Sequence, residues 1–257
     1  MIARPHPSSL SEARLRLEEI ASREGCFDTP LLVRAGQLSP QEAIGTPLRR
    51  DFPIVLGKEK ILEARFENAR GHAFTDSPVE FRGTLAEVLS RPLVTNADRA
   101  LLVATLNALL RHLGRIDRTV HCRDEEPERC GARLAAEMRA HDGEATVGLI
   151  GCNPAMVAAL AAEFGPEHVR VSDRNPDNVG RRKHGVAVWD GAGATEALIR
   201  DTSFVAVTGT TVVNDTFPAI RDLLRRYRRK YVVYGVTGAG LCHLFGWPRF
   251  CPFSHDA

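Results

Sequence analysis

The hydrophobic pattern changes its period roughly halfway along the chain. In residues 8–24 apolar side chains recur among charged ones, which predicts an N-terminal helix. Extended pieces are expected at 31–38, 51–59 and 61–68. From Lys60 to Phe66 apolar and polar residues alternate, as they do in a half-buried strand. The first part of the chain is therefore expected to mix helices and strands.

A longer helix is expected further on. Gly71–Pro78 contains turn residues and is predicted to be a loop. The pattern then becomes helical over 96–114, with Asn96 as the expected N-cap and a glycine as the expected stop. Asn107 lies inside this helix, and a buried amide without a partner costs about 1–3 kcal/mol, so we expect it to be hydrogen-bonded. Residues 131–140 form another predicted helix.

Beyond residue 144, short apolar runs alternate with helical segments. The five predicted strands are 145–151, 168–173, 186–190, 203–209 and 230–238, and the helices between and after them are 154–164, 194–201, 217–229 and 239–246. This alternation indicates βαβ units and a parallel sheet. The predicted fold class is α/β, with a small mixed α+β domain at 1–140 and a Rossmann-like parallel-sheet domain at 144–257.

Composition narrows the class of function. The chain has 34 Lys and Arg against 32 Asp and Glu, a net charge of +2, which argues against a dedicated nucleic-acid binder. No apolar run is long enough to span a bilayer and the start lacks a signal-peptide core, so we expect a cytoplasmic protein without a membrane partner. The six cysteines are then expected to be thiols or metal ligands rather than disulfides.

Polar residues follow four of the predicted parallel strands, at the edge where such sheets bind ligands. The first turn departs from the dinucleotide fingerprint, because it reads Gly148, Gly151 and then Pro154. Asp173 stands where nucleotide-binding folds place a ribose-binding acid, and the alternative is a solvated or capping carboxylate. The predicted cofactor-binding residues are Asn153, Asp173, Thr208, Gly209, Thr210, Thr211, Asn214, Thr216 and Thr237.

The segment Thr208–Thr216 (TGTTVVNDT) offers hydroxyls, backbone N–H groups and an amide before a helix, which suits an anionic or polar ligand. The alternative is that Asn214, Asp215 and Thr216 merely cap that helix.

Cysteine and histidine form two clusters that are distant in sequence. Thiolate and imidazole are the ligands that borderline and soft metals prefer, but neither cluster has the C-x-x-C spacing of a zinc ribbon. The alternative is that each cysteine is a small buried hydrophobe. Cys152 is expected to line the site without binding metal. The predicted metal ligands are His121, Cys122, Cys130, Cys242, His243 and Cys251.

Several segments taken together resemble one family. They are Leu56–Glu59, Gly71–Asp76, Asn96–Ala108, Thr119–Cys122 and Thr208–Thr216. The chain is similar to the uncharacterised putative heavy-metal chelation family from about residue 50 to its end. The resemblance implies an enolase N-terminal-like part, a Rossmann-like part and a ligand site in the cleft between them. Two departures are Asp215 in place of a usual glycine, and Gly235–Gly238 in place of a Gly-Pro-Ser/Thr turn.

Three functions remain open from the sequence. The first is binding of a transition metal (Zn, Cu, Fe or Ni) or a metal-linked small molecule between the domains. The second is a Rossmann-type enzyme with a nucleotide or S-adenosylmethionine-like cofactor, for which no nucleophile–base–orienter set is visible. The third is a non-catalytic small-molecule binding protein. The expected partner is a metal ion or small molecule, and a homodimer is compatible with the sequence.

Overall fold

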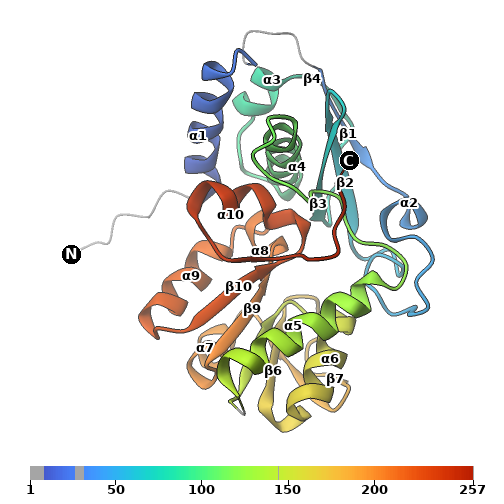
Figure 1. The fold of residues 1–257 in the computed structure, drawn as a ribbon, viewed down its shortest axis with the longest axis vertical. Helices are drawn as coiled ribbons and strands as arrows, with labels where there is room; N and C mark the ends of the chain where they lie inside the picture. The colour runs from blue at the N-terminus through green and yellow to red at the C-terminus, as the bar shows by residue number, and fades with distance from the viewer. Residues whose placement is uncertain (1–8, 27–31, 144, 257) are drawn as a thin grey trace.

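The computed structural model describes residues 9–26, 32–143 and 145–256, and contains two sheets (Figure 1). The upper, smaller sheet has four antiparallel strands in the order β3-β2-β1-β4. Its strands are β1 (Leu32–Gln37), β2 (Lys60–Phe66), β3 (Ala69–Thr75) and β4 (Phe81–Thr84). The helices of this part are α1 (Ser9–Arg23), α2 (Pro40–Ile44), α3 (Leu85–Ser90) and α4 (Asn96–His112).

Strand β2 shows why this sheet packs on α4. Its residues alternate, so that Leu62, Ala64 and Phe66 join the core cluster that contains α4, while Glu63 lies on the opposite face. The helix starts one residue earlier than expected, because Thr95 is the N-cap and forms a capping box with Asp98. Asn107 is buried and fully used, as expected: its amide donates to the carbonyls of His72 and Val236 and accepts from Gly240 N.

Two predictions for this part are wrong. The predicted loop at 71–78 is strand β3 as far as Thr75. A Cβ on Gly71 would lie 2.3 Å from the backbone of Ala104 and of Ala108, so this glycine serves close packing of β3 on α4 rather than a turn. The predicted extended piece at 51–59 is instead a run of turns, with Lys58 N bonded to Pro53 O.

The larger sheet has seven strands in the order β11-β10-β9-β5-β6-β8-β7, and all pairs are parallel except β7 with β8. The strands are β5 (Val147–Ile150), β6 (Val169–Asp173), β7 (Arg182–Lys183), β8 (Val186–Asp190), β9 (Phe204–Thr208), β10 (Lys230–Tyr234) and β11 (Arg249–Phe250). The helices are α5 (Glu126–Asp142), α6 (Pro154–Phe164), α7 (Thr195–Asp201), α8 (Thr210–Val213), α9 (Phe217–Arg226) and α10 (Ala239–Phe245), with short 3₁₀ turns at η1 (Pro166–His168) and η2 (Val236–Gly238).

Helices cover both faces of this sheet. Side chains of α5 and α6 form one core cluster with one face of the strands. Side chains of α7, α8, α9 and α10 form another cluster, which continues into α1, α4 and the small sheet. The two sheets therefore share a continuous core, and the predicted α/β class is confirmed. The predicted domain boundaries at 140 and 144 stay a prediction. In the described part of the chain, none of the helices has the length and apolar character needed to cross a bilayer.

Candidate functional site

The strand order of the large sheet reverses at β5, which makes the edge of β5 the topological switch point. From β5 the chain runs outward through β6 to β8 on one side, and through β9 and β10 to β11 on the other. Ligands of parallel α/β sheets bind outside the carboxyl ends of the strands at such a switch point. Gly151, which follows β5, has φ +94°, and a Cβ there would lie 2.6 Å from the Thr208 methyl group. Glycine therefore lets the ends of β5 and β9 converge at this point.

A cleft of about 960 Å³ opens over this switch point, and we call it the acidic cleft. Its walls carry far more negative than positive side chains. The acidic ones are Glu59, Asp76, Asp173, Asp177, Glu196 and Asp215, and the basic ones are Lys58 and Arg174. Lys58 is paired with Asp177 and Glu196 with Arg226, which leaves Glu59, Asp76, Asp173 and Asp215 against Arg174, so the remaining charge of the cleft is negative. The volume suits a small organic molecule rather than a bare ion.

The carboxylates of the cleft are held in different ways. Asp173 accepts hydrogen bonds from the backbone N–H groups of Cys152 at 2.5 Å and Asn175 at 2.6 Å. Asp76 accepts from the amide of Asn96 at 3.0 Å and the hydroxyl of Ser77 at 2.8 Å. Burial acts to raise the pKa of Asp76, but these hydrogen bonds outweigh it and the pKa is lowered.

Glu59 is the exception among these carboxylates. No hydrogen bond to its side chain is formed by the described residues. Burial raises its pKa to about 7, helped by the negative charges of Asp173 and Asp76. Glu59 therefore changes its charge near neutral pH, at a position that faces into the cleft.

A second, smaller cavity of about 100 Å³ adjoins the first, and we call it the thiol cavity. The two cavities share a wall that includes Glu59, Gly151, Asp173 and Thr208. The thiol cavity is distinguished by its soft donor atoms, which come from segments far apart in sequence. These are the side chains of His121, Cys122, Cys130, Cys152 and Cys251.

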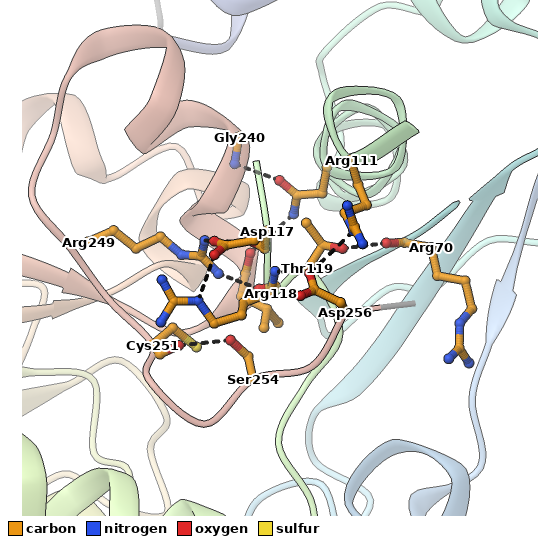
Figure 2. Close-up of polar contacts among 12 residues, drawn as sticks. Arg70, Arg111, Asp117, Arg118, Thr119, Gly240, Arg249, Cys251, Ser254 and Asp256 are labelled. Carbon is orange, nitrogen blue, oxygen red and sulfur yellow. Dashed lines mark hydrogen bonds and ion pairs between the residues drawn. The ribbon is translucent and has the colours of Figure 1, made fainter. Parts of the chain in front are cut away.

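The C-terminal segment is fastened to the chain just before Cys122 (Figure 2). The guanidinium of Arg249 donates to the carbonyls of Asp117, at 3.0 Å, and Arg118. Further along, the backbones of Val120 and His255 exchange two hydrogen bonds of 3.0 and 2.8 Å. Figure 2 also shows the Ser254 hydroxyl bonded to the Cys251 carbonyl, at 2.9 Å. These contacts place Cys251 on the same cavity as Cys122.

The side chain of His121 is fixed by its surroundings and forms one long hydrogen bond with a neighbouring thiol. Its ring packs edge-on against Phe74, with the centroids 5.0 Å apart. Its backbone N–H donates to Nδ1 of the buried His72 at 3.1 Å. Its Nε2 faces Sγ of Cys122 at 3.9 Å, and its Nδ1 is buried with no hydrogen-bond partner among the described residues. Burial, together with the nearby His72, lowers the pKa of His121 to about 4, so the imidazole is neutral at physiological pH.

Three thiols of this cavity, those of Cys122, Cys130 and Cys152, are uncharged at physiological pH as well. Burial raises the pKa of Cys122 well above its usual value, and the neighbouring Cys251 and Cys130 raise it further. Burial likewise raises the pKa of Cys152 to about 12, with a contribution from Asp173. Apart from Glu59 and Asp173 on the shared wall, the thiol cavity is lined mainly by soft donors, whereas the acidic cleft beside it is lined by carboxylates.

The predicted metal ligands are brought together only in part. His121, Cys122, Cys130 and Cys251 share the thiol cavity. Cys242 is buried in the core cluster around α10 instead, and His243 is exposed. Across residues 9–26, 32–143 and 145–256, no group of three or more His, Cys, Asp or Glu side chains is arranged to hold a metal ion. Cys152 lines the cavity, as expected.

All nine predicted cofactor-binding residues lie on the walls of the two cavities. Their part in binding a ligand stays a prediction, because several are engaged within the fold. Asn153 caps α6, Thr211 donates to Thr208 O, and Thr237 accepts from Phe74 N. Thr216 stands at the N-cap of α9, but its hydroxyl donates to Thr211 O and accepts no hydrogen bond from the helix, so its side chain does not cap α9. Part of the predicted loop is the short helix α8.

The sequence did not single out the residues that the smaller part of the molecule contributes to the cleft. Lys58, Glu59 and Asp76 lie within segments that resemble the family, yet they follow no predicted parallel strand. Their turns lie beside the carboxyl edge of the large sheet only because of the tertiary packing. In the sequence, only the resemblance of these segments to the family could have pointed to these three residues.

Part of the chain is similar to known proteins. Residues 134–245 match the family described as "Putative heavy-metal chelation" (DUF364), so the expected resemblance to that family is confirmed. Two solved DUF364 structures of unknown function are similar. One, from Desulfitobacterium hafniense DCB-2, is 15% identical with a TM-score of 0.50, over 73% of this chain and 72% of that chain. The other, from Pyrococcus horikoshii, is 18% identical with a TM-score of 0.49, over 90% and 79%. No match was found among the curated proteins.

Proposed function

We propose that this chain binds a small, positively charged ligand in the acidic cleft, either an organic cation or a cationic metal complex. The observation that carries the proposal is the cleft itself, which lies at the switch point with six carboxylates and two basic side chains on its walls. A cleft lined by one sign of charge concentrates ligands of the opposite sign. One of the two basic side chains, Lys58, is already neutralised by Asp177.

The family description adds metal to the ligands to be considered. A bare divalent ion needs several converging donors, and the described residues offer no group of three. A metal complex brings its own ligands, and needs from the protein only a cavity of suitable size and charge. The cleft volume of about 960 Å³ therefore favours a metal-linked small molecule over a bare ion.

Hexaamminecobalt(III) is a direct probe of this proposal, because it is a trication whose coordination sites are all filled. Isothermal titration at pH 8 is expected to show about one equivalent bound, with an affinity that weakens as salt is added. The double variant Glu59→Gln/Asp76→Asn removes two carboxylates without disturbing the backbone bonds to Asp173, and is expected to bind at least tenfold more weakly. Glu19→Gln, an exposed carboxylate on α1 outside the cleft, is the matched control.

Equal binding by wild type and the double variant would contradict the proposal, as would an affinity that Glu19→Gln lowers to the same extent. Both results would mean that the probe binds diffusely to the surface.

A second candidate function rests on Asp173. It ends β6, the strand after β5, which is where a ribose-binding acid stands in nucleotide-binding folds. S-adenosylmethionine combines a ribose with a sulfonium cation, so it would match both the position of Asp173 and the charge of the cleft. It is expected to raise the melting temperature more than its uncharged thioether product, S-adenosylhomocysteine, does. Equal shifts, or none, would count against this candidate.

A further inference from the structure

The carboxyl groups of the acidic cleft differ in how many hydrogen bonds they already accept. Each oxygen of Asp173 accepts one backbone N–H group, and both oxygens of Asp76 accept from the amide of Asn96. Glu59 accepts no hydrogen bond from the described residues, although its carboxyl group is buried in the wall of the cleft. A ligand that donates hydrogen bonds therefore finds unused acceptor oxygens at Glu59.

Ser172 adds a second unpaired polar group to the same cleft. Its side chain is fully buried, at 0% exposure, and its Oγ has no hydrogen-bond partner among the described residues. It lines the cleft next to Asp173, whose negative charge acts on Glu59. Buried polar groups are almost always hydrogen-bonded, because an unpaired one costs free energy. Two independent observations thus point to a ligand that forms hydrogen bonds in this part of the cleft.

The lining of the cleft also indicates how a cation is held there. A fully alkylated cation, such as a quaternary ammonium ion, has no N–H group and is typically bound against the faces of aromatic rings. None of the described residues that line the acidic cleft is aromatic. The cleft instead offers carboxylate oxygens, which suit a cation that carries N–H donors.

Apolar side chains complete the walls of the cleft. They include Ala219, Ile220 and Leu223 of α9, together with Ile150 and Pro53. Such a surface fits the hydrocarbon part of a ligand. A primary alkylammonium ion combines such a hydrocarbon part with a charged group that has three N–H donors.

We propose that the acidic cleft is selective for primary alkylammonium ions, and that the –NH₃⁺ group of the ligand donates hydrogen bonds to the carboxylate of Glu59. This inference rests on the proposed function, because it names the class of cation that the cleft takes. The charges of Asp76 and Asp173, which act on Glu59, attract the same group. Between the two kinds of ligand considered above, the inference selects the organic cation.

The test compares two dications that differ in their N–H groups. One is protonated 1,5-diaminopentane, and the other is its bis(trimethylammonium) counterpart, which has the same charge and chain but no N–H group. At pH 8 the diamine is fully charged, since the pKa of an alkylammonium group is about 10. Isothermal titration of the wild-type chain is expected to show that the diamine binds about tenfold or more tightly. The uncharged 1,5-pentanediol is expected to show no measurable binding.

Two variants test whether Glu59 is the source of this preference. Glu59→Gln is expected to reduce the ratio of the two affinities at least threefold, because the side chain loses its charge and one acceptor oxygen. Asp215→Asn is the matched control, since it removes one charge from an exposed residue of the same cleft. It should weaken both dications alike and leave their ratio unchanged.

Equal affinities of the wild-type chain for the two dications would overturn the inference, as would a ratio that Glu59→Gln leaves unaltered. The wild-type ratio decides the matter even if Glu59→Gln fails to fold. Hexaamminecobalt(III) separates the two proposals. If it binds but the diamine does not, or if the two dications bind alike, the selectivity is wrong and cation binding in the cleft stands. If none of these cations binds, both proposals are wrong.

Discussion

The acidic cleft and the thiol cavity share a wall but differ in almost every physical property. The cleft is wide, open to solvent and lined with carboxylates, whereas the cavity is small and lined with thiols, and carboxylates reach it only at the shared wall. Burial raises the pKa values of Glu59 and Cys122 alike. The raised pKa of Glu59 lies near neutral pH, whereas the raised pKa of Cys122 lies far above it. The same desolvation therefore leaves a switchable charge in one compartment and a permanently neutral donor in the other.

The shared wall gives the largest expected effect. Gly151→Ala places a Cβ 2.6 Å from the Thr208 methyl group at a φ of +94°, so we expect a loss of about 2–3 kcal/mol in the free energy of unfolding. Cobalt hexaammine binding should weaken as well. Denaturant melts and a titration with the trication measure these two effects.

Gly193→Ala is the matched control, since Gly193 also lines the cleft but has open space around it. If the Gly151→Ala chain were as stable as the control, a side chain would be tolerated between the ends of β5 and β9, which contradicts the close approach to Thr208.

The next effect should be confined to the thiol cavity. Arg249→Ala removes the donors to Asp117 O and Arg118 O, and we expect it to cost about 1–3 kcal/mol. The segment carrying Cys251 should loosen, so thiol labelling by dithionitrobenzoate should accelerate while cobalt hexaammine binding stays unchanged. Arg133→Ala, which breaks an exposed pair with Glu137 on α5, is the control and should change neither. Equal labelling rates in the two variants would mean that the hydrogen bonds of Arg249 do not hold the segment that carries Cys251 in place.

The third effect should be confined to the acidic cleft and depend on pH. The pKa of Glu59 rises from 4.5 to about 7 on folding, so the folded chain holds a proton that the unfolded chain releases between these values. Stability contributed by this group is present below pH 4.5 and is lost as pH rises through 7. Glu59→Gln should therefore raise the free energy of unfolding at pH 8 by about 1 kcal/mol or more, and leave it unchanged at pH 4.

Affinity should show the opposite trend. Cobalt hexaammine should bind wild type more tightly at pH 8 than at pH 6, because Glu59 becomes charged, and the Glu59→Gln chain should lose most of that dependence. If the substitution left the pH profile unaltered, the charge of Glu59 would not contribute to cation binding in the cleft.

The smallest expected effect concerns Asp215, an exposed residue with φ of 54°. Asp215→Gly relieves the left-handed conformation and should stabilise the fold by up to about 1 kcal/mol. Asp215→Asn keeps a residue that tolerates this conformation and should leave stability nearly unchanged. Both variants remove one charge from the cleft, so both should weaken cation binding by a similar few-fold factor. A difference in affinity between them would mean that backbone shape, not charge, matters there.

The large sheet could be predicted from the sequence because its strands are buried on both faces and read as short apolar runs between helices. The small sheet was harder, since Gly71 signals a turn locally but is required by the close approach of β3 to α4. The Thr208–Thr216 loop was placed on the cleft because it ends a strand of a parallel sheet.

The residues that make the site acidic could not be assigned in this way. Glu59 and Asp76 reach the cleft through packing of the two sheets, for which local periodicity holds no information. The two Cys/His clusters come together only in part. Cys251 lines the same cavity as Cys122, whereas the side chain of Cys242, on α10, lies in the hydrophobic core.

The most direct test of the account is a single titration of the Cys122→Ser chain with cobalt hexaammine at pH 8. If the two compartments are chemically independent, the affinity should match that of wild type within twofold. A tenfold or greater fall in affinity for the trication would contradict the division into an acidic cleft and a thiol cavity.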